Sequence, residues 1–122
     1  MNDKDLELCF LTIPEAAKLI QDRKLSPVEL VSAFMERISR VDPIIKSYIT
    51  ILADQVMEEA KIAEAEISAG QYKGLLHGIP LAHKDLYDTK GIKTTAQSKV
   101  YETRVPDVDS TVIERLNRAG AM

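Results

Sequence analysis

Lys84 is the residue whose type and setting most favour chemistry in this sequence. It follows a mostly apolar stretch at residues 79–82, so we expect its side chain to be buried. Burial favours the uncharged amine unless a carboxylate compensates, and an uncharged amine can act as a general base. Asp85 comes next, but successive side chains of a strand point to opposite faces, so Asp85 need not pair with Lys84. We predict Lys84 as a catalytic residue; the alternative is an ordinary surface charge, since the chain has 16 basic residues.

Other candidate ligands and nucleophiles form no strong pattern. His77, His83 and Asp85 lack the spacing of a known metal site, and the chain has 2 histidines in all. The glycines within residues 70–78 do not match a phosphate-binding loop. We therefore expect no metal and no cofactor. His77 is predicted to be a turn or packing residue, and the single Cys9 a small apolar filler.

Helical patterns fill the first two thirds of the chain and would position the candidate residues. Residues 12–15 (Thr-Ile-Pro-Glu) form a capping box that begins a helix reaching about Arg23. Residues 26–29 (Ser-Pro-Val-Glu) form a second, with proline at the first helical position. Proline restricts the residue before it, so we expect this helix to end at residues 42–43 (Asp-Pro). A third helix is predicted over residues 54–69.

Strand patterns alternate with these helices. The β-branched and aromatic residues at 47–52 predict a short strand, and residues 78–87 predict a second one that carries Lys84. Asp109 or Ser110 is expected to cap a last helix.

The order of elements predicts an α/β fold. N-terminal helices are followed by the first strands and helix of a mixed sheet. We expect one domain over residues 1–122, helical in 1–72 and starting an α/β core in 73–122. Residues 120–122 are predicted to leave the last helix and enter another strand, so we expect the sheet to be incomplete and the chain to be truncated.

Composition narrows the classes of partner. Hydrophobic residues make up 45% and charged residues 29%, as in a soluble globular protein, and the net charge is -3. Without a basic block, binding of nucleic acid by this segment is not expected. Neither an N-terminal leader nor an apolar run of membrane-spanning length is present, so we expect no membrane association and a cytoplasmic location.

Three linked motifs make the sequence similar to a known family. They are residues 74–85 (Gly-Leu-Leu-His-Gly-Ile-Pro-Leu-Ala-His-Lys-Asp), residues 88–99 with Thr94-Thr95-Ala96-Gln97-Ser98-Lys99, and the helical segment 109–121. Their order and spacing resemble the amidase signature family. The resemblance covers essentially the whole chain and is most specific from Gly74 to Ala121.

The resemblance implies a carboxamide C–N hydrolase that uses a lysine, a serine in a cis peptide and a nucleophilic serine. Lys84 matches the lysine, whereas nothing in this sequence matches either serine, and Ser98 is more simply structural. We therefore expect the chain to be inactive alone. Gln97 stands where a glycine is common in the family, which bears on the local turn. His83, Leu86 and Tyr87 flank the lysine with side chains that vary between subfamilies.

Three functions remain open. The first is a stand-alone amidase acting on small-molecule amides, which the run at residues 77–80 and Ala96 favour. The second is the A-type component of a glutamine-dependent aminoacyl-tRNA amidotransferase. The third is a non-catalytic helical interaction module. A homodimer or amidotransferase partner subunits would be the corresponding assemblies.

Overall fold

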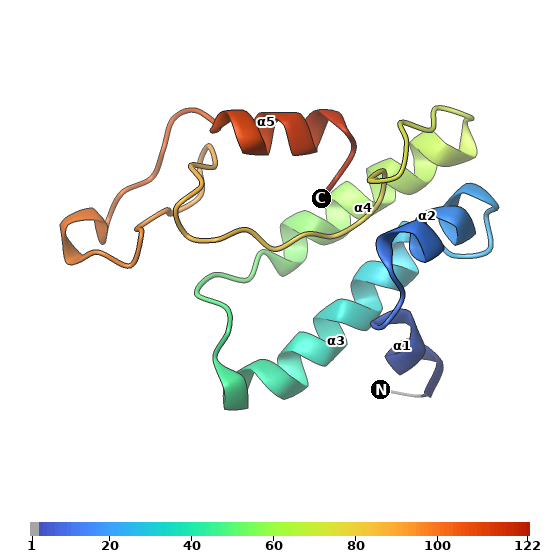
Figure 1. Cartoon of the computed structure of the whole chain (residues 1–122), viewed down its shortest axis with the longest axis horizontal. Helices are drawn as coiled ribbons and strands as arrows, with labels where there is room; N and C mark the ends of the chain where they lie inside the picture. Colours follow the sequence, from blue (N-terminus) through green and yellow to red (C-terminus); the bar gives the residue numbers. More distant parts are fainter. Residues whose placement is uncertain (1–2) are drawn as a thin grey trace.

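The computed structural model describes residues 3–122, and all regular structure within them is helical (Figure 1). The elements are α1 (Asp3–Leu8), α2 (Ile13–Gln21), α3 (Pro27–Ile45), α4 (Ala53–Ser68), a 3-10 helix η1 (Lys99–Tyr101) and α5 (Thr111–Arg118). The three longer predicted helices and the last one are present. α1 and η1 were not predicted.

Both predicted N-terminal caps are confirmed. Glu15 N–H donates to Thr12 Oγ1 over 3.4 Å, while Thr12 N–H donates to Glu15 Oε2 over 2.8 Å. This reciprocal pair satisfies two of the donors that the first turn of a helix leaves free. Ser26 Oγ accepts from the N–H groups of Val28 and Glu29 at the start of α3.

The predicted end of α3 was wrong, because the helix continues through Pro43 to Ile45. The chain leaves the helix at Lys46, whose backbone is left-handed with φ +50°. Asp42 Oδ1 then accepts from Ser47 N–H over 2.7 Å and from Tyr48 N–H over 3.1 Å. A side chain that caps the exit thus stabilises a last turn that the proline was expected to exclude.

The apolar core lies among the first four helices. α3 packs against α1 and α4, and the core is filled mainly by aliphatic side chains. Its buried members are Leu8, Ala16, Ile20, Leu25, Leu30, Ala33, Ile67 and Ile79. Burying a large aliphatic side chain contributes about 1.5–3 kcal/mol, so this cluster is the main source of stability. Cys9 packs against it half-buried, as expected of an apolar filler, and burial raises the pKa of its thiol.

The α/β prediction was wrong, since no strand or sheet forms within residues 3–122. A strand needs a partner to pair its backbone groups, and residues 47–52 run exposed between α3 and α4. Residues 78–81 meet residues 120–122 through three backbone hydrogen bonds only. Beyond them the chain turns, with the N–H groups of Leu86 and Tyr87 both donating to the carbonyl of Lys84.

The last helix was predicted correctly in position. α5 follows Ser110, although the hydroxyl of Ser110 makes no capping bond. Figure 1 shows α5 at one side of the molecule, joined to α4 by a long segment with no regular structure except η1. None of the helices in residues 3–122 is long and apolar enough to cross a membrane.

Candidate active site

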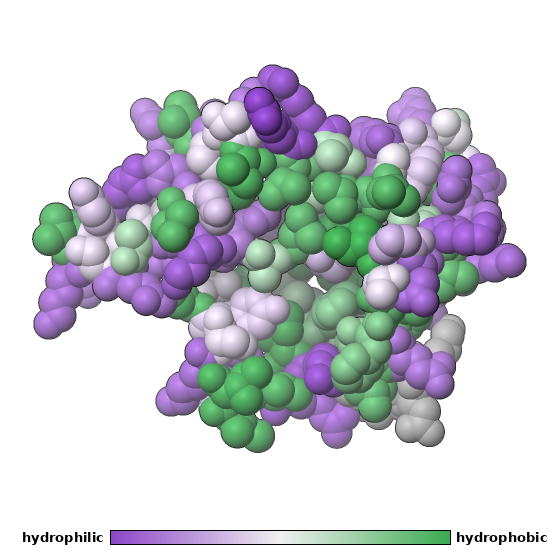
Figure 2. Space-filling view, viewed as in Figure 1, coloured by the Kyte–Doolittle hydropathy of each residue, from purple (hydrophilic) through white to green (hydrophobic). Residues whose placement is uncertain are grey.

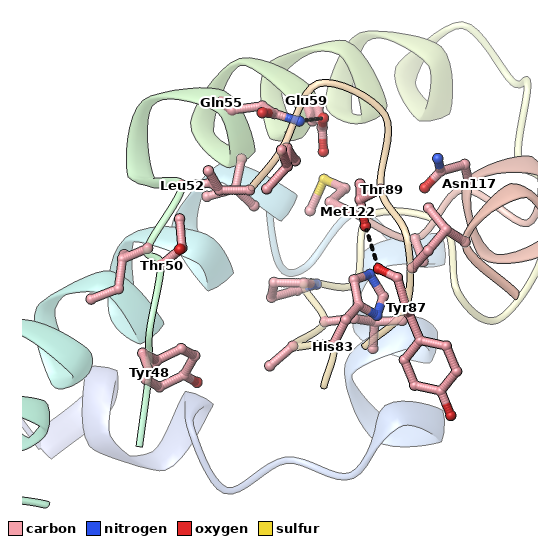
Figure 3. Close-up of a pocket in the computed structure, with 18 of the residues that line it drawn as sticks. Tyr48, Thr50, Leu52, Gln55, Glu59, His83, Tyr87, Thr89, Asn117 and Met122 are labelled. Carbon is pink, nitrogen blue, oxygen red and sulfur yellow. Dashed lines mark hydrogen bonds between the residues drawn. The ribbon is translucent and has the colours of Figure 1, made fainter. Parts of the chain in front are cut away.

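A cavity of about 910 Å³ separates the helical core from the segment that carries Lys84. Its walls come from α3, residues 46–52, α4, residues 80–94 and the C-terminal end of the chain. Figure 2 shows apolar side chains around a hollow near the middle of this face. In Figure 3, Tyr48 and Thr50 lie on one side of the cavity and His83 and Tyr87 on the other.

Lys84 lines this cavity, but its side chain is exposed. The expectation of a buried amine was therefore wrong for this structure. The reason is local: the backbone turns directly after Lys84, and no other element of residues 3–122 covers the side chain. The amine of Lys84 makes neither a hydrogen bond nor an ion pair with the described residues, so it is available to a group that enters the cavity.

Asp85 does not form an ion pair with Lys84; its carboxylate binds the loop that follows. Oδ1 accepts from Thr95 N–H over 2.8 Å, and Oδ2 accepts from the Thr95 hydroxyl over 2.5 Å and from Gln97 N–H over 3.3 Å. The hydrogen bonds from Thr95 hold the pKa of Asp85 below its ordinary value, and the nearby charge of Lys84 adds to the effect.

His77 is a buried packing residue, in agreement with the prediction from sequence. Only 1% of its surface is exposed. Nδ1 accepts from Lys73 N–H over 3.1 Å, so the ring proton belongs on Nε2, which lies 2.9 Å from Glu66 Oε2 and donates to it. His77 thus joins α4 to the turn that leads towards Lys84.

Glu66 was missed as a structural partner, because the pattern of α4 placed it on a solvated face. The same Oε2 atom also accepts from Lys73 Nζ over 2.7 Å. The hydrogen bonds from Lys73, and then from His77, lower the pKa of the Glu66 carboxyl. No local signal indicates this arrangement, since its partners lie seven and eleven residues away.

The remaining candidates fall into structural roles. Ser98 Oγ accepts from Val100 N–H and caps η1, which supports a structural assignment. Within residues 5–122, whose side chains are described, no three His, Cys, Asp or Glu side chains gather as a metal site would require. His77 and Asp85 instead have separate partners, Glu66 and the loop at 95–97.

The family follows from comparison with known proteins. The sequence profile of the amidase family matches residues 29–122, which include Lys84 and the whole segment beyond it. This chain belongs to the amidase family. The resemblance stated from its sequence motifs is confirmed.

Curated members of the family include close matches in sequence. The A-type component of the glutamyl-tRNA(Gln) amidotransferase of Acinetobacter baumannii is 44% identical over 114 residues, which are 93% of this chain and 23% of that protein. The corresponding amidotransferase component of Dehalococcoides mccartyi is 40% identical over 116 residues, covering 95% of this chain and 24% of that protein. The chain thus spans about a quarter of the length of the curated relatives it matches.

Solved structures give the same picture of the fold. The peptide amidase of Stenotrophomonas maltophilia is 28% identical, with a TM-score of 0.85 over 93% of this chain and 23% of that one. Fatty acid amide hydrolase superposes with a TM-score of 0.93 over 99% of this chain and 21% of that one. At 23% identity the second similarity shows the fold alone. The irregular segment between α4 and α5 therefore belongs to a known amidase arrangement.

Proposed function

We propose that Lys84 is the general base of an amidase that contains this chain as its N-terminal part and cleaves carboxamide C–N bonds. The observation that carries the proposal is the profile match over residues 29–122, within which Lys84 occupies the position of the family's lysine. The unpaired amine of Lys84 in the wall of the cavity supports it.

The proposed chemistry needs groups beyond these 122 residues. Lys84 would accept a proton through one serine, which in turn activates a second serine for attack on the amide carbonyl. The amine departs with a proton, and water or another acceptor resolves the acyl-enzyme. Neither serine has a counterpart in this sequence. The activity is therefore proposed for the longer protein.

Burial of Lys84 is part of the same proposal. A general base works best when its protonation equilibrium lies near the operating pH, and removal of water from a lysine moves the equilibrium in that direction. Lys84 is exposed in the described residues, so the segment that brings the serines would also have to cover it. This requirement makes the proposal specific: the serines and the cover arrive together.

Between a stand-alone amidase and an amidotransferase component, the identities favour the amidotransferase. The chain is 40–44% identical to the two amidotransferase proteins and 28% identical to the peptide amidase. The amide would then be the side chain of glutamine, partner subunits would be needed, and the location would be the cytoplasm. The run at residues 77–80 and Ala96 keep the stand-alone amidase as the second candidate.

A chimera tests the proposal directly. This chain would replace the matching quarter of the Acinetobacter baumannii amidotransferase protein, and ammonia release would be measured with glutamine and with a simple aryl amide. We expect hydrolysis of glutamine that increases when the partner subunits are added. Hydrolysis of the aryl amide alone would favour the stand-alone enzyme. A folded chimera without either activity would favour the helical interaction module and contradict the proposal.

A further inference from the structure

The loop after Lys84 contains backbone conformations that need support. Ala96 and Gln97 are consecutive non-glycine residues with left-handed backbone, at φ +49° and φ +55°. Each such residue costs about 1–2 kcal/mol relative to ordinary helical backbone. A pair of them persists only when surrounding contacts hold it in place.

The carboxylate of Asp85 supplies those contacts. It accepts from the N–H groups on both sides of Ala96, those of Thr95 and Gln97, and also from the Thr95 hydroxyl. Gln97 N–H is shared with Thr95 Oγ1 at 3.1 Å. Hydrogen bonds to an ionised acceptor are about twice as strong as neutral ones. One side chain therefore fixes the strained loop at three points.

The same side chain is separated from Lys84 by one peptide bond. The carbonyl of that peptide bond belongs to Lys84 and accepts from Leu86 N–H over 2.7 Å and from Tyr87 N–H over 3.1 Å. The backbone at Lys84 is thus restrained twice, by this turn and by the attachment of Asp85 to residues 95–97. The carboxylate is fully occupied by the loop, which leaves the amine of Lys84 without a partner among the described residues.

We propose that Asp85 is a positioning residue for Lys84. It directs its charge to the loop at residues 95–97, and by doing so it fixes the backbone from which the Lys84 side chain enters the cavity. This inference rests on the proposed function only for what Lys84 then does; the restraint itself is a property of these 122 residues. The loop is held by charge rather than by apolar burial, because Ala96 and Gln97 are both exposed.

The restraint is tested in this chain by amide hydrogen exchange and NMR relaxation. Asp85→Asn keeps the shape but turns one acceptor into a donor that faces the Thr95 hydroxyl and Gln97 N–H. We expect about tenfold faster exchange at Thr95 and Gln97, with a lower order parameter at Lys84 and unchanged exchange in α3. Thr95→Val removes the hydroxyl alone and should give a smaller change in the same direction. Order at Lys84 that is unchanged in both variants would overturn the inference.

Its effect on chemistry is tested in the active chimera. Asp85→Asn should lower kcat about tenfold or more with little change in KM, because the substrate still binds while the base is misplaced. Asp85→Glu, which keeps the charge, should recover part of the loss. A loss that Glu does not rescue, or a rise in KM alone, would overturn the positioning role. If Lys84→Ala leaves activity intact, the proposed function fails, whereas the NMR result for Asp85 still stands or falls by itself.

Discussion

The two halves of this molecule are stabilised by different interactions. Residues 3–68 form α1–α4 around an aliphatic core in which Ile20 and Leu30 are almost completely buried. In residues 79–110, which carry Lys84, only Ile79, Thr94 and Pro106 are buried. The part of the chain with candidate chemistry therefore gains little from the hydrophobic effect.

Three aspartates supply the long-range contacts of the second half. Asp85 binds Thr95 and Gln97, Asp88 forms a bidentate pair with Arg104, and Asp109 accepts from Lys90 N–H over 2.7 Å. Hydrogen bonds of this kind are each worth about 1–3 kcal/mol, less when exposed to water. We infer that the second half opens locally at a lower free energy than the helical core. Substitutions in each half would reveal that difference.

The largest effect is expected from truncation in the aliphatic core. Ile20→Ala in α2 should lower the free energy of unfolding by about 2–5 kcal/mol, because it removes a buried side chain and leaves a cavity. Urea denaturation measures the change. Ile62→Ala in α4, where the side chain is 60% exposed, is the matched control and should stay within about 0.5 kcal/mol. Similar losses at both positions would contradict the assignment of the core.

The contact between the two halves is tested by a pair of helix-ending glycines. Gly70 and Gly120 have almost the same backbone, at φ +82° and φ +84°. A Cβ at Gly70 meets nothing, whereas a Cβ at Gly120 would lie 2.7 Å from Cδ2 of His77. We expect Gly70→Ala to destabilise by about 1 kcal/mol and Gly120→Ala by about 2–4 kcal/mol. Equal thermal shifts would show that His77 does not pack against the chain at Gly120.

A smaller effect is expected at the helix caps. Thr12→Ala removes one side of the capping box and should cost about 1 kcal/mol. Ser110→Ala should cost clearly less, because the hydroxyl of Ser110 makes no capping bond. Chemical denaturation of the two variants side by side distinguishes them. A larger loss at Ser110 would mean that its buried hydroxyl has a partner in solution.

The smallest effect is a local loss of order in acid. The pKa values of Asp85 and Asp88 are lowered in the folded chain, so their contribution is present above the ordinary value of 3.8 and is lost as the pH falls through the folded pKa. Amide exchange in residues 90–104 should accelerate below about pH 4, before exchange in α3 does, after correction for intrinsic rates. In Asp85→Asn the step at Thr95 should disappear. Simultaneous loss in both regions would contradict the separation of the two halves.

What the sequence predicted follows the range of the interactions involved. The caps at Thr12 and Ser26 were predictable, because each involves residues within three positions of one another. Residues 47–52 have the composition of a strand, but a strand also needs a partner, which no local pattern reveals. The turn after Lys84 removed the second predicted strand in the same way.

The candidate site shows the same limit. Lys84 was found through motifs that span residues 74–121, and the profile match shows the family. The exposure of Lys84 was not foreseen, because apolar neighbours in sequence do not determine which other segments cover a side chain. The bonds of Glu66 to His77 and of Asp85 to Thr95 join residues eleven and ten positions apart. Such pairs are set by tertiary structure and give no periodic signal.

The central claim is that the amine of Lys84 is the base of an amidase. The most direct measurement is the rate of amide hydrolysis by the active chimera carrying Lys84→Met, compared with Lys90→Met, which changes another exposed lysine six residues away. We predict that Lys84→Met lowers kcat by about 10²–10⁴-fold, the usual contribution of a general base, while Lys90→Met stays within about twofold of the parent. Equal activity of the two folded variants would contradict the account.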